Sequence, residues 1–103
     1  VILDRNRIQN DDFCEEQMRM FDIPAKWRAF GWNVKEIDGH NMDEVVDGMN
    51  FLSSTNDGPS ILIAHTVKGH GVSFMADNPA FHGAAPNDEQ YAQAMAELGE
   101  VVA

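Results

Sequence analysis

Residues 61 to 64 constrain the fold more than any other part of the chain. They read Ile-Leu-Ile-Ala, a continuous apolar run that follows the turn-forming segment Asn56-Asp57-Gly58-Pro59. A strand with one face in water alternates apolar and polar residues, whereas a continuous apolar run is typical of a strand covered on both faces. The sequence therefore predicts an α/β fold with a parallel sheet and helices on both faces.

The segment before this run supplies a neighbouring strand and a connecting helix. Val34 and Ile37 mark a strand over residues 32–38, which ends at Asp38-Gly39. Asn41 followed by Glu44 is a capping-box pattern and predicts a helix over residues 42–54. The order strand, helix, strand predicts a parallel crossover. The apolar side of this helix comprises Met42, Val45, Val46, Met49 and Leu52.

The first thirty residues predict one more strand and one short helix. Val1 to Asp4 reads as part of a buried strand, and residues 5–23 read as a long polar loop with a single helical turn. Pro24 suits the first position of a helix that ends before Gly31. Trp27 and Phe30 lie three positions apart, so we expect both to pack on one face of that helix.

The last forty residues combine a loop and a helix. Residues 66–86 are rich in glycine and predict a long loop. Asn87 with Gln90 three positions on is a second capping pattern and predicts a final helix. Its expected apolar stripe is Tyr91, Ala94, Met95, Leu98, Val101 and Val102.

The predicted sheet is small for its class. Three parallel strands are fewer than open parallel sheets usually have, and the first strand has no turn or helix before it. We therefore expect residues 1–103 to be the C-terminal portion of a larger domain.

Charge and cysteine content exclude several classes of function. The chain has 17 acidic and 7 basic residues, a formal charge of -10 that repels nucleic acid and anionic lipid. Cys14 is the only cysteine, so neither an internal disulfide nor a cysteine-rich zinc site is possible, and a cytoplasmic location is the default expectation. No apolar run approaches the ~18 residues that cross a membrane.

Polar residues gather where the predicted strands end, which is where open parallel sheets bind ligands. Asp4 and Asn6 carry oxygen atoms suited to Mg²⁺ or Ca²⁺, although an Asp-x-Asn segment after a strand also forms turns. A calcium-binding helix-loop-helix is excluded, because Ile8 and Gln9 occupy its fifth position and its obligatory glycine position.

Two loop segments are further candidates for an anion site. Thr66-Val67-Lys68-Gly69-His70-Gly71 follows the buried strand, and its amides suit a phosphate, although similar loops are often simple turns. Phe81-His82-Gly83 places a histidine where it could donate to a phosphate oxygen or move a proton. An exposed surface role remains open for Lys68 and for His82. His40 fits a helix entry as well as a ligand.

Taken in order, five segments resemble one family. They are Asp4-Arg5-Asn6-Arg7-Ile8-Gln9, Lys26-Trp27-Arg28-Ala29-Phe30-Gly31-Trp32, Ile37-Asp38-Gly39-His40, Thr66-Val67-Lys68-Gly69-His70-Gly71 and His82-Gly83-Ala84-Ala85-Pro86. This series resembles the later part of the N-terminal domain of transketolases, which binds thiamine diphosphate. The resemblance covers nearly the whole chain.

The resemblance implies a reaction and roles for individual residues. The reaction is two-carbon ketol transfer between sugar phosphates, with thiamine diphosphate as the electron sink. Asn6, through its side chain, and Ile8, through its carbonyl, would hold the Mg²⁺ or Ca²⁺ that bridges the diphosphate. His82 would lie near the diphosphate and the substrate entrance, as a catalytic and cofactor-binding residue. Lys68 and His70 would line the same region, Lys68 as a cofactor-binding residue.

The resemblance also implies partners that this sequence does not contain. Transketolases are dimers whose catalytic glutamate lies on a pyrimidine-binding domain, either fused or in a separate C-terminal subunit. The upstream metal-binding Gly-Asp-Gly segment of the family is absent here, and residues 10–22 depart from the family wording. Two alternatives therefore stay open, a fragment of 1-deoxyxylulose-5-phosphate synthase and a non-catalytic truncated partner or dimerisation module. The segment from Lys26 to Trp32 favours transketolase over the synthase.

Overall fold

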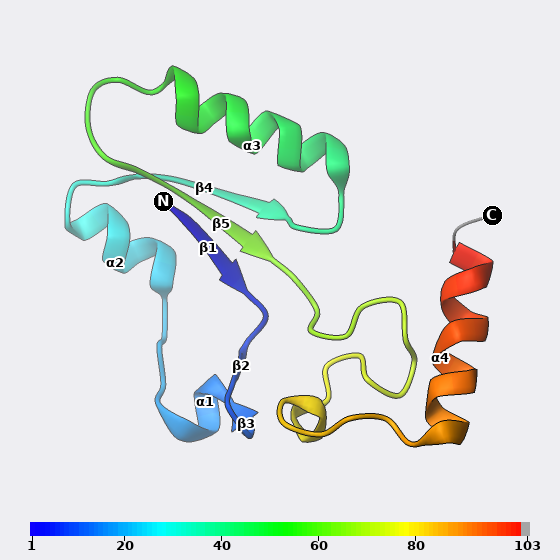
Figure 1. Cartoon of the computed structure of the whole chain (residues 1–103). Helices are drawn as coiled ribbons and strands as arrows, with labels where there is room; N and C mark the ends of the chain where they lie inside the picture. Colours follow the sequence, from blue (N-terminus) through cyan, green and yellow to red (C-terminus); the bar gives the residue numbers. More distant parts are fainter. Residues whose placement is uncertain (102–103) are drawn as a thin grey trace. The chain divides into compact units, whose positions relative to one another are not determined.

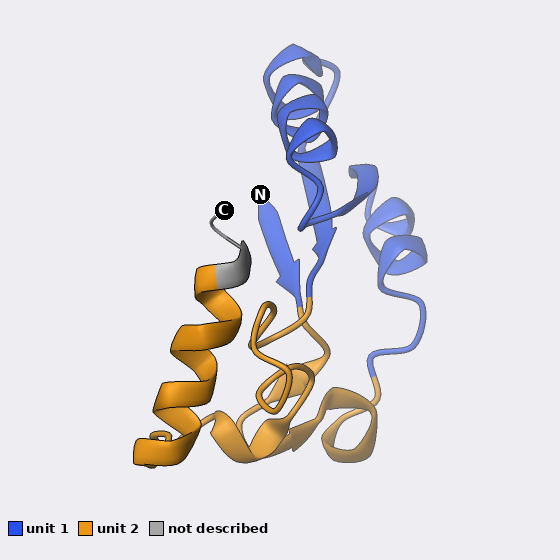
Figure 2. Ribbon diagram, turned by 90° about the vertical axis from the view of Figure 1, so that its right-hand side faces the viewer, with its two compact units in different colours: residues 1–5, 20–66 blue, residues 6–19, 67–103 orange. Residues whose placement is uncertain are grey.

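The structure, a computed structural model, describes residues 1–101 and the side chains of residues 1–99. It contains two compact units, residues 1–5 with 20–66 and residues 6–19 with the segment from residue 67 onward (Figure 2). The first unit holds a parallel sheet of β1 (Ile2–Arg5), β4 (Asn33–Asp38) and β5 (Ser60–His65) in the order β1-β5-β4. The predicted parallel sheet is confirmed, with the apolar run in its central strand.

The three strands end level with one another. Arg5 in β1 and Asp38 in β4 are both register partners of His65 in β5. The three segments that leave the sheet after these residues therefore start from one edge, which is the edge at which parallel sheets bind ligands.

Helices cover both faces of this sheet, as the apolar run predicts. Figure 1 shows α2 (Ile23–Ala29) and α3 (Met42–Ser54) on opposite sides of the strands. Ile61 and Ile63 pack with Ile23 of α2 on one face, whereas Leu62 and Ala64 pack with Ile37 on the other. Because Ile61, Leu62 and Ile63 are at most 1% exposed, β5 forms the core of this unit. Partly buried apolar residues complete the two clusters, Leu3, Trp27, Trp32 and Val34 on the α2 side and Val45 and Leu52 on the α3 side.

Helix α3 has the bounds that the sequence predicts, and its cap is tied to the sheet. The Asn41 side chain accepts hydrogen bonds from the backbone N–H groups of Asp43 and Glu44 at 3.1 and 3.4 Å. The Glu44 carboxylate accepts from the backbone N–H of Asp38 at 2.8 Å. This bond fixes the start of α3 against the end of β4.

The contact between α3 and β5 depends on a glycine. A Cβ atom on Gly48 would lie 2.8 Å from both Cδ atoms of Leu62, so only glycine allows this approach. Of the predicted apolar side of α3, Val45 and Leu52 pack on the sheet. The other three residues are exposed, because they lie on the adjoining flank of the helix at 100° per residue. They are Met42, Val46 and Met49.

Helix α2 differs from its prediction in two respects. It begins at Ile23, one residue before Pro24, and Asp22 caps it by accepting from the backbone N–H of Ala25 at 2.9 Å. Trp27 packs as expected and meets Trp32 edge to face, with ring centroids 4.7 Å apart. The expected packing of Phe30 is wrong: its side chain is 83% exposed, because the helix ends at Ala29.

The N-terminal part of the second unit contains a hairpin that the sequence analysis missed. β2 (Ile8–Gln9) and β3 (Asp12–Phe13) pair antiparallel, and α1 (Cys14–Gln17) follows as the expected helical turn. Strands of two residues are too short to show a period. Asn10 has φ 54° in the connecting turn, a conformation that asparagine tolerates better than most residues.

The C-terminal part of this unit is a long loop followed by α4 (Asp88–Val101). The loop includes a short 3₁₀ helix, η1 (Pro79–Phe81). The predicted capping box is confirmed: Asn87 and Gln90 each donate a backbone N–H to the other's side chain, at 3.0 and 2.8 Å. In the predicted stripe of α4, Ala94 is buried and Tyr91, Met95 and Leu98 are exposed. Val101 and Val102 lie outside the residues whose side chains are described.

Within residues 1–101, none of the helices has the length and apolar character needed to cross a membrane.

Candidate functional site

Hydrogen bonds join the ends of the three parallel strands. Thr66 donates its hydroxyl to the carboxylate of Asp4, which links the end of β5 to β1. The backbone N–H of Gly39 donates to the carbonyl of His65 at 2.8 Å, which links β4 to β5. The edge from which the candidate residues depart is therefore held together by its own polar groups.

Asn6, the first residue after β1, forms a turn. Its side-chain oxygen accepts a hydrogen bond from the backbone N–H of Ile8 at 2.9 Å. This is the turn-forming role that the sequence analysis left open beside metal binding. The two roles are compatible, because a carboxamide oxygen has two lone pairs and this bond uses one.

The Ile8 carbonyl points to the same side of the hairpin as the Asn6 side chain. Arg7 accepts from the backbone N–H of Cys14 at 2.8 Å, and the next pair along the hairpin is Ile8 with Phe13. Hydrogen-bonded and open pairs alternate in antiparallel strands, so Ile8 turns its N–H and C=O away from Phe13. Since the N–H meets Asn6, the carbonyl faces the same way.

These two oxygens fit part of a metal site. Carbonyl and carboxamide oxygens are suitable ligands for Mg²⁺ and Ca²⁺, but both are neutral, and such sites usually include a carboxylate. In the described part of the chain there is no group of three or more histidine, cysteine, aspartate or glutamate side chains that could hold a metal ion. The remaining ligands would have to come from outside these residues.

The glycine-rich segment after β5 folds into a closed loop. The carbonyl of Lys68 accepts from the backbone N–H of Asp77 at 2.9 Å, which joins the two ends of residues 68–77. Gly69 has φ 75°, and a Cβ atom there would lie 2.6 Å from the carbonyl oxygen of Met75. The loop can close in this way only with glycine at position 69. Lys68 is partly buried and Val72 is buried.

A carboxylate of α4 holds the middle of this loop. Glu97 accepts from the backbone N–H and the hydroxyl of Ser73, at 2.6 and 2.7 Å. Gln93 donates to the same carboxylate at 2.7 Å. Hydrogen bonds from the Ser73 hydroxyl, the Ser73 backbone and Gln93 lower the pKa of Glu97. The sequence analysis missed this contact, because the two residues lie 24 positions apart and no local pattern joins them.

His82 lies at the C-terminal end of η1, where its backbone N–H donates to the carbonyl of Pro79 at 2.9 Å. Its side chain is exposed. Within the described residues the imidazole makes no hydrogen bond, and a Cβ atom on the following Gly83 would have no neighbour within 4 Å. The surroundings leave the ring accessible to a ligand.

The four predicted site residues, Asn6, Ile8, Lys68 and His82, all belong to the second compact unit. Apart from the bond between Asn6 and Ile8, no hydrogen bond joins their side chains in residues 1–101. His40 lies in the first unit, where its backbone N–H donates to Asp38 at 2.9 Å. That contact matches its predicted position at a helix entry.

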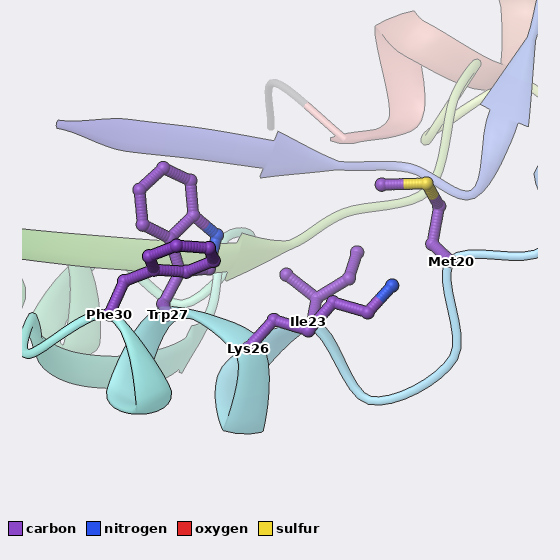
Figure 3. Close-up of a pocket in the computed structure, with 5 residues that line it drawn as sticks. All are labelled: Met20, Ile23, Lys26, Trp27 and Phe30. Atoms are coloured by element: carbon purple, nitrogen blue, oxygen red, sulfur yellow. The ribbon is translucent and has the colours of Figure 1, made fainter.

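The first unit also holds two features that no sequence pattern indicated. Glu36 on β4 lies 3.0 Å from the His65 imidazole and 3.8 Å from the guanidinium of Arg28. An apolar hollow of about 280 Å³ lies beside α2 (Figure 3). None of the predicted site residues lines it; the residues that do are Met20, Ile23, Lys26, Trp27 and Phe30.

Comparison with known families places the chain. Residues 1–101 match the family model described as transketolase, thiamine diphosphate binding domain. The chain belongs to the transketolase family. This confirms the resemblance drawn from the five segments and identifies the domain as the one that binds thiamine diphosphate.

Curated relatives agree with the family model. One of the two apulose-4-phosphate transketolase subunits of Phocaeicola vulgatus is 39% identical over 97% of this chain and 36% of its own length. The 6-deoxy-6-sulfo-D-fructose transketolase subunit SqwG of a Clostridium species is 38% identical over 92% of this chain and 34% of its own length. Human transketolase is 32% identical over 81% of the chain and 13% of its own length. The chain thus spans about a third of the length of these two subunits.

A solved structure matches the fold. Transketolase from Campylobacter jejuni superposes with a TM-score of 0.83 over 95% of this chain and 15% of that chain, at 22% identity. Both the parallel sheet and the helices on its two faces are therefore those of a transketolase.

Proposed function

We propose that these residues are the C-terminal portion of the thiamine-diphosphate-binding domain of a transketolase. The complete enzyme transfers a two-carbon ketol unit between sugar phosphates. The proposal rests on a family match that covers residues 1–101 and on similarity to proteins named as transketolases and transketolase subunits.

The observation that carries the site is the shared direction of two oxygens, the side-chain oxygen of Asn6 and the carbonyl of Ile8. We propose that they bind the Mg²⁺ or Ca²⁺ that bridges the diphosphate of the cofactor. Two neutral ligands on one turn suit a metal that takes its negative ligands from the diphosphate and from a carboxylate elsewhere.

Thiamine diphosphate, when bound, supplies the electron sink for breaking and forming the carbon–carbon bond. The residues of this chain would bind and orient it. Lys68 would neutralise diphosphate charge, and His82 would donate to a phosphate oxygen or move a proton at the substrate entrance. The chain carries a net charge of -10, so a local cation and a metal are needed before an anionic cofactor can bind.

A partner completes the proposed enzyme. We propose that a pyrimidine-binding domain, fused or in a separate C-terminal subunit, supplies the catalytic glutamate, and that the complete enzyme is a dimer. Two of the relatives are named as transketolase subunits, which supports the split arrangement. We place the enzyme in the reducing cytoplasm, consistent with its single cysteine, Cys14.

The test uses the complete protein that contains this sequence, together with its partner subunit if the two are separate. Ketose phosphates are supplied with aldose acceptors, and apulose 4-phosphate and 6-deoxy-6-sulfofructose are included because they appear in the names of relatives. We expect two-carbon transfer that requires both thiamine diphosphate and a divalent cation. Absence of transfer and of cofactor binding in the assembled enzyme would refute the proposal.

A further inference from the structure

The contact between Ser73 and Glu97 is the strongest polar link in the second unit. Both carboxylate oxygens are used, one by the Ser73 backbone N–H at 2.6 Å and the other by the Ser73 hydroxyl at 2.7 Å. Gln93, one helical turn earlier on α4, donates to Glu97 at 2.7 Å and to the Ser73 hydroxyl at 3.2 Å. Bonds to an ionised carboxylate are shorter and stronger than neutral ones. A charged side chain on a helix thus grips one residue of a loop twice.

The gripped residue lies in the middle of the closed loop of residues 68–77. The loop is joined at its ends by the Lys68 carbonyl and the Asp77 backbone N–H, at 2.9 Å. Inside it, the carbonyl of Val72 accepts from the backbone N–H groups of Met75 and Ala76 at 3.0 and 2.9 Å. These internal bonds make the loop a compact piece, so holding Ser73 also restricts Lys68.

A second contact shows that the loop lies directly against α4. A Cβ atom built on Gly71, which has φ 92°, would lie 3.4 Å from a Cδ atom of Leu98. Glu97 and Leu98 therefore hold neighbouring parts of the loop. The same helix begins at the Asn87 cap, five residues after His82, so α4 connects two of the predicted site segments.

We propose that Glu97 is a positioning residue for cofactor binding: through Ser73 it holds the loop of residues 68–77 so that Lys68 meets the diphosphate. The inference rests on the proposed function, since it takes Lys68 to be a cofactor-binding residue. Glu97 itself touches neither cofactor nor substrate. Its effect is to reduce the number of loop conformations that binding would otherwise have to select.

The test compares four variants of the complete enzyme. Glu97→Ala removes the contact, and Glu97→Gln keeps its shape without the charge. Ser73→Ala removes one of the two bonds and leaves the backbone N–H in place. Glu89→Gln makes the same charge change on an exposed part of the same helix and serves as the control.

Two measurements separate positioning from general stability. Amide hydrogen exchange is recorded on enzyme without cofactor, and we expect residues 70–77 to exchange at least ~10-fold faster in Glu97→Ala while β5 is unchanged. Titration then gives the dissociation constant of thiamine diphosphate with Mg²⁺, which we expect to rise ~10-fold, with kcat at saturating cofactor nearly unchanged. Ser73→Ala and Glu97→Gln should lie between wild type and Glu97→Ala, and Glu89→Gln should match wild type.

Each contrary result has a distinct meaning. Unchanged exchange in Glu97→Ala would overturn the claim that Glu97 holds the loop. Faster exchange with unaltered cofactor affinity would overturn its positioning role and leave the proposed function intact. If wild-type enzyme bound no thiamine diphosphate at all, the proposed function would fail and this inference with it.

Discussion

The Asn6 side-chain oxygen and the Ile8 backbone N–H are joined by a hydrogen bond of 2.9 Å, so the turn and the proposed metal site share one atom. The bond turns the Ile8 carbonyl toward the side on which Asn6 lies. Sharing this oxygen couples the local fold to metal binding, because a change at Asn6 removes one ligand and releases the other.

Asn6→Ala should therefore affect binding more than stability. In the complete enzyme we expect the dissociation constant for thiamine diphosphate with Mg²⁺ to rise at least ~10-fold, by loss of one ligand and disorder of the second. Loss of the turn bond should lower the free energy of unfolding by about 1 kcal/mol. Titration calorimetry and thermal unfolding measure the two effects. Asn56→Ala, in an exposed turn of the other unit, is the control, and comparable losses in affinity and stability for Asn6→Ala would show a purely structural role.

His82 should contribute to activity and not to folding. Its ring is exposed and makes no hydrogen bond within residues 1–101, so His82→Ala should change the free energy of unfolding by less than about 0.5 kcal/mol. We expect kcat/KM to fall by ~10²-fold, which is the usual scale for losing a group that moves a proton. His82→Gln keeps a hydrogen-bond donor, so recovery of cofactor affinity without recovery of kcat would separate the two proposed roles. Wild-type kinetics in His82→Ala would exclude both.

The 103 residues alone should show no turnover and weak or no binding of thiamine diphosphate with Mg²⁺. Only two neutral ligands, Asn6 and Ile8, are available, and the Gly-Asp-Gly segment of the family is absent. Calorimetry with the isolated chain tests this expectation after circular dichroism has established that the chain is folded. Tight metal-dependent binding by the folded chain would contradict the incomplete-site interpretation.

Two glycine substitutions should have opposite signs. Gly48→Ala should destabilise the first unit by about 1–3 kcal/mol, because the new methyl group would lie 2.8 Å from the side chain of Leu62. Gly99→Ala should stabilise α4 by up to about 1 kcal/mol, because nothing lies within 4 Å and alanine favours a helix. Thermal unfolding of each variant in the complete protein provides the comparison. A neutral Gly48→Ala would mean that α3 can move away from the sheet at little cost.

The hold of Glu97 on the loop should weaken in acid. Its pKa is lowered from the ordinary value of 4.5 by the bonds from Ser73 and Gln93, neither of which titrates. A lowered pKa means that the contact is fully formed above the ordinary value and is lost as the pH falls through the lowered one. Exchange protection of residues 70–77, corrected for intrinsic rates, should be constant from about pH 8 to 5.5 and decline below about pH 4. The decline should be absent in Glu97→Gln, and a decline of equal size in that variant would assign it to other groups.

The elements that sequence analysis predicted best carry their own local signals. The apolar run at Ile61 predicted a strand covered on both faces, and the Asn41 and Asn87 caps predicted the starts of two helices. In each case the deciding interactions span only a few residues. Phe30 was wrong because spacing along a helix does not show where the helix ends.

Contacts between distant residues could not be predicted. Ser73 meets Glu97 across 24 positions, and Glu36 meets His65 across 29. The hairpin after Asn6 was missed because its strands are two residues long, although this hairpin gives Ile8 its orientation. The candidate residues were found through a resemblance between ordered segments, since a lone asparagine or histidine has no distinctive pattern of its own.

A strand that is apolar on both faces does not determine its own alignment. Sliding β5 by one residue would exchange the Ile61 and Leu62 faces, and both faces would remain hydrophobic. Shape must therefore set the alignment, and the close fit of Gly48 against Leu62 accepts only one position of the strand. A substitution at Gly48 would then be felt at the far end of β5, since a shifted strand would no longer bring His65 level with Arg5 and Asp38.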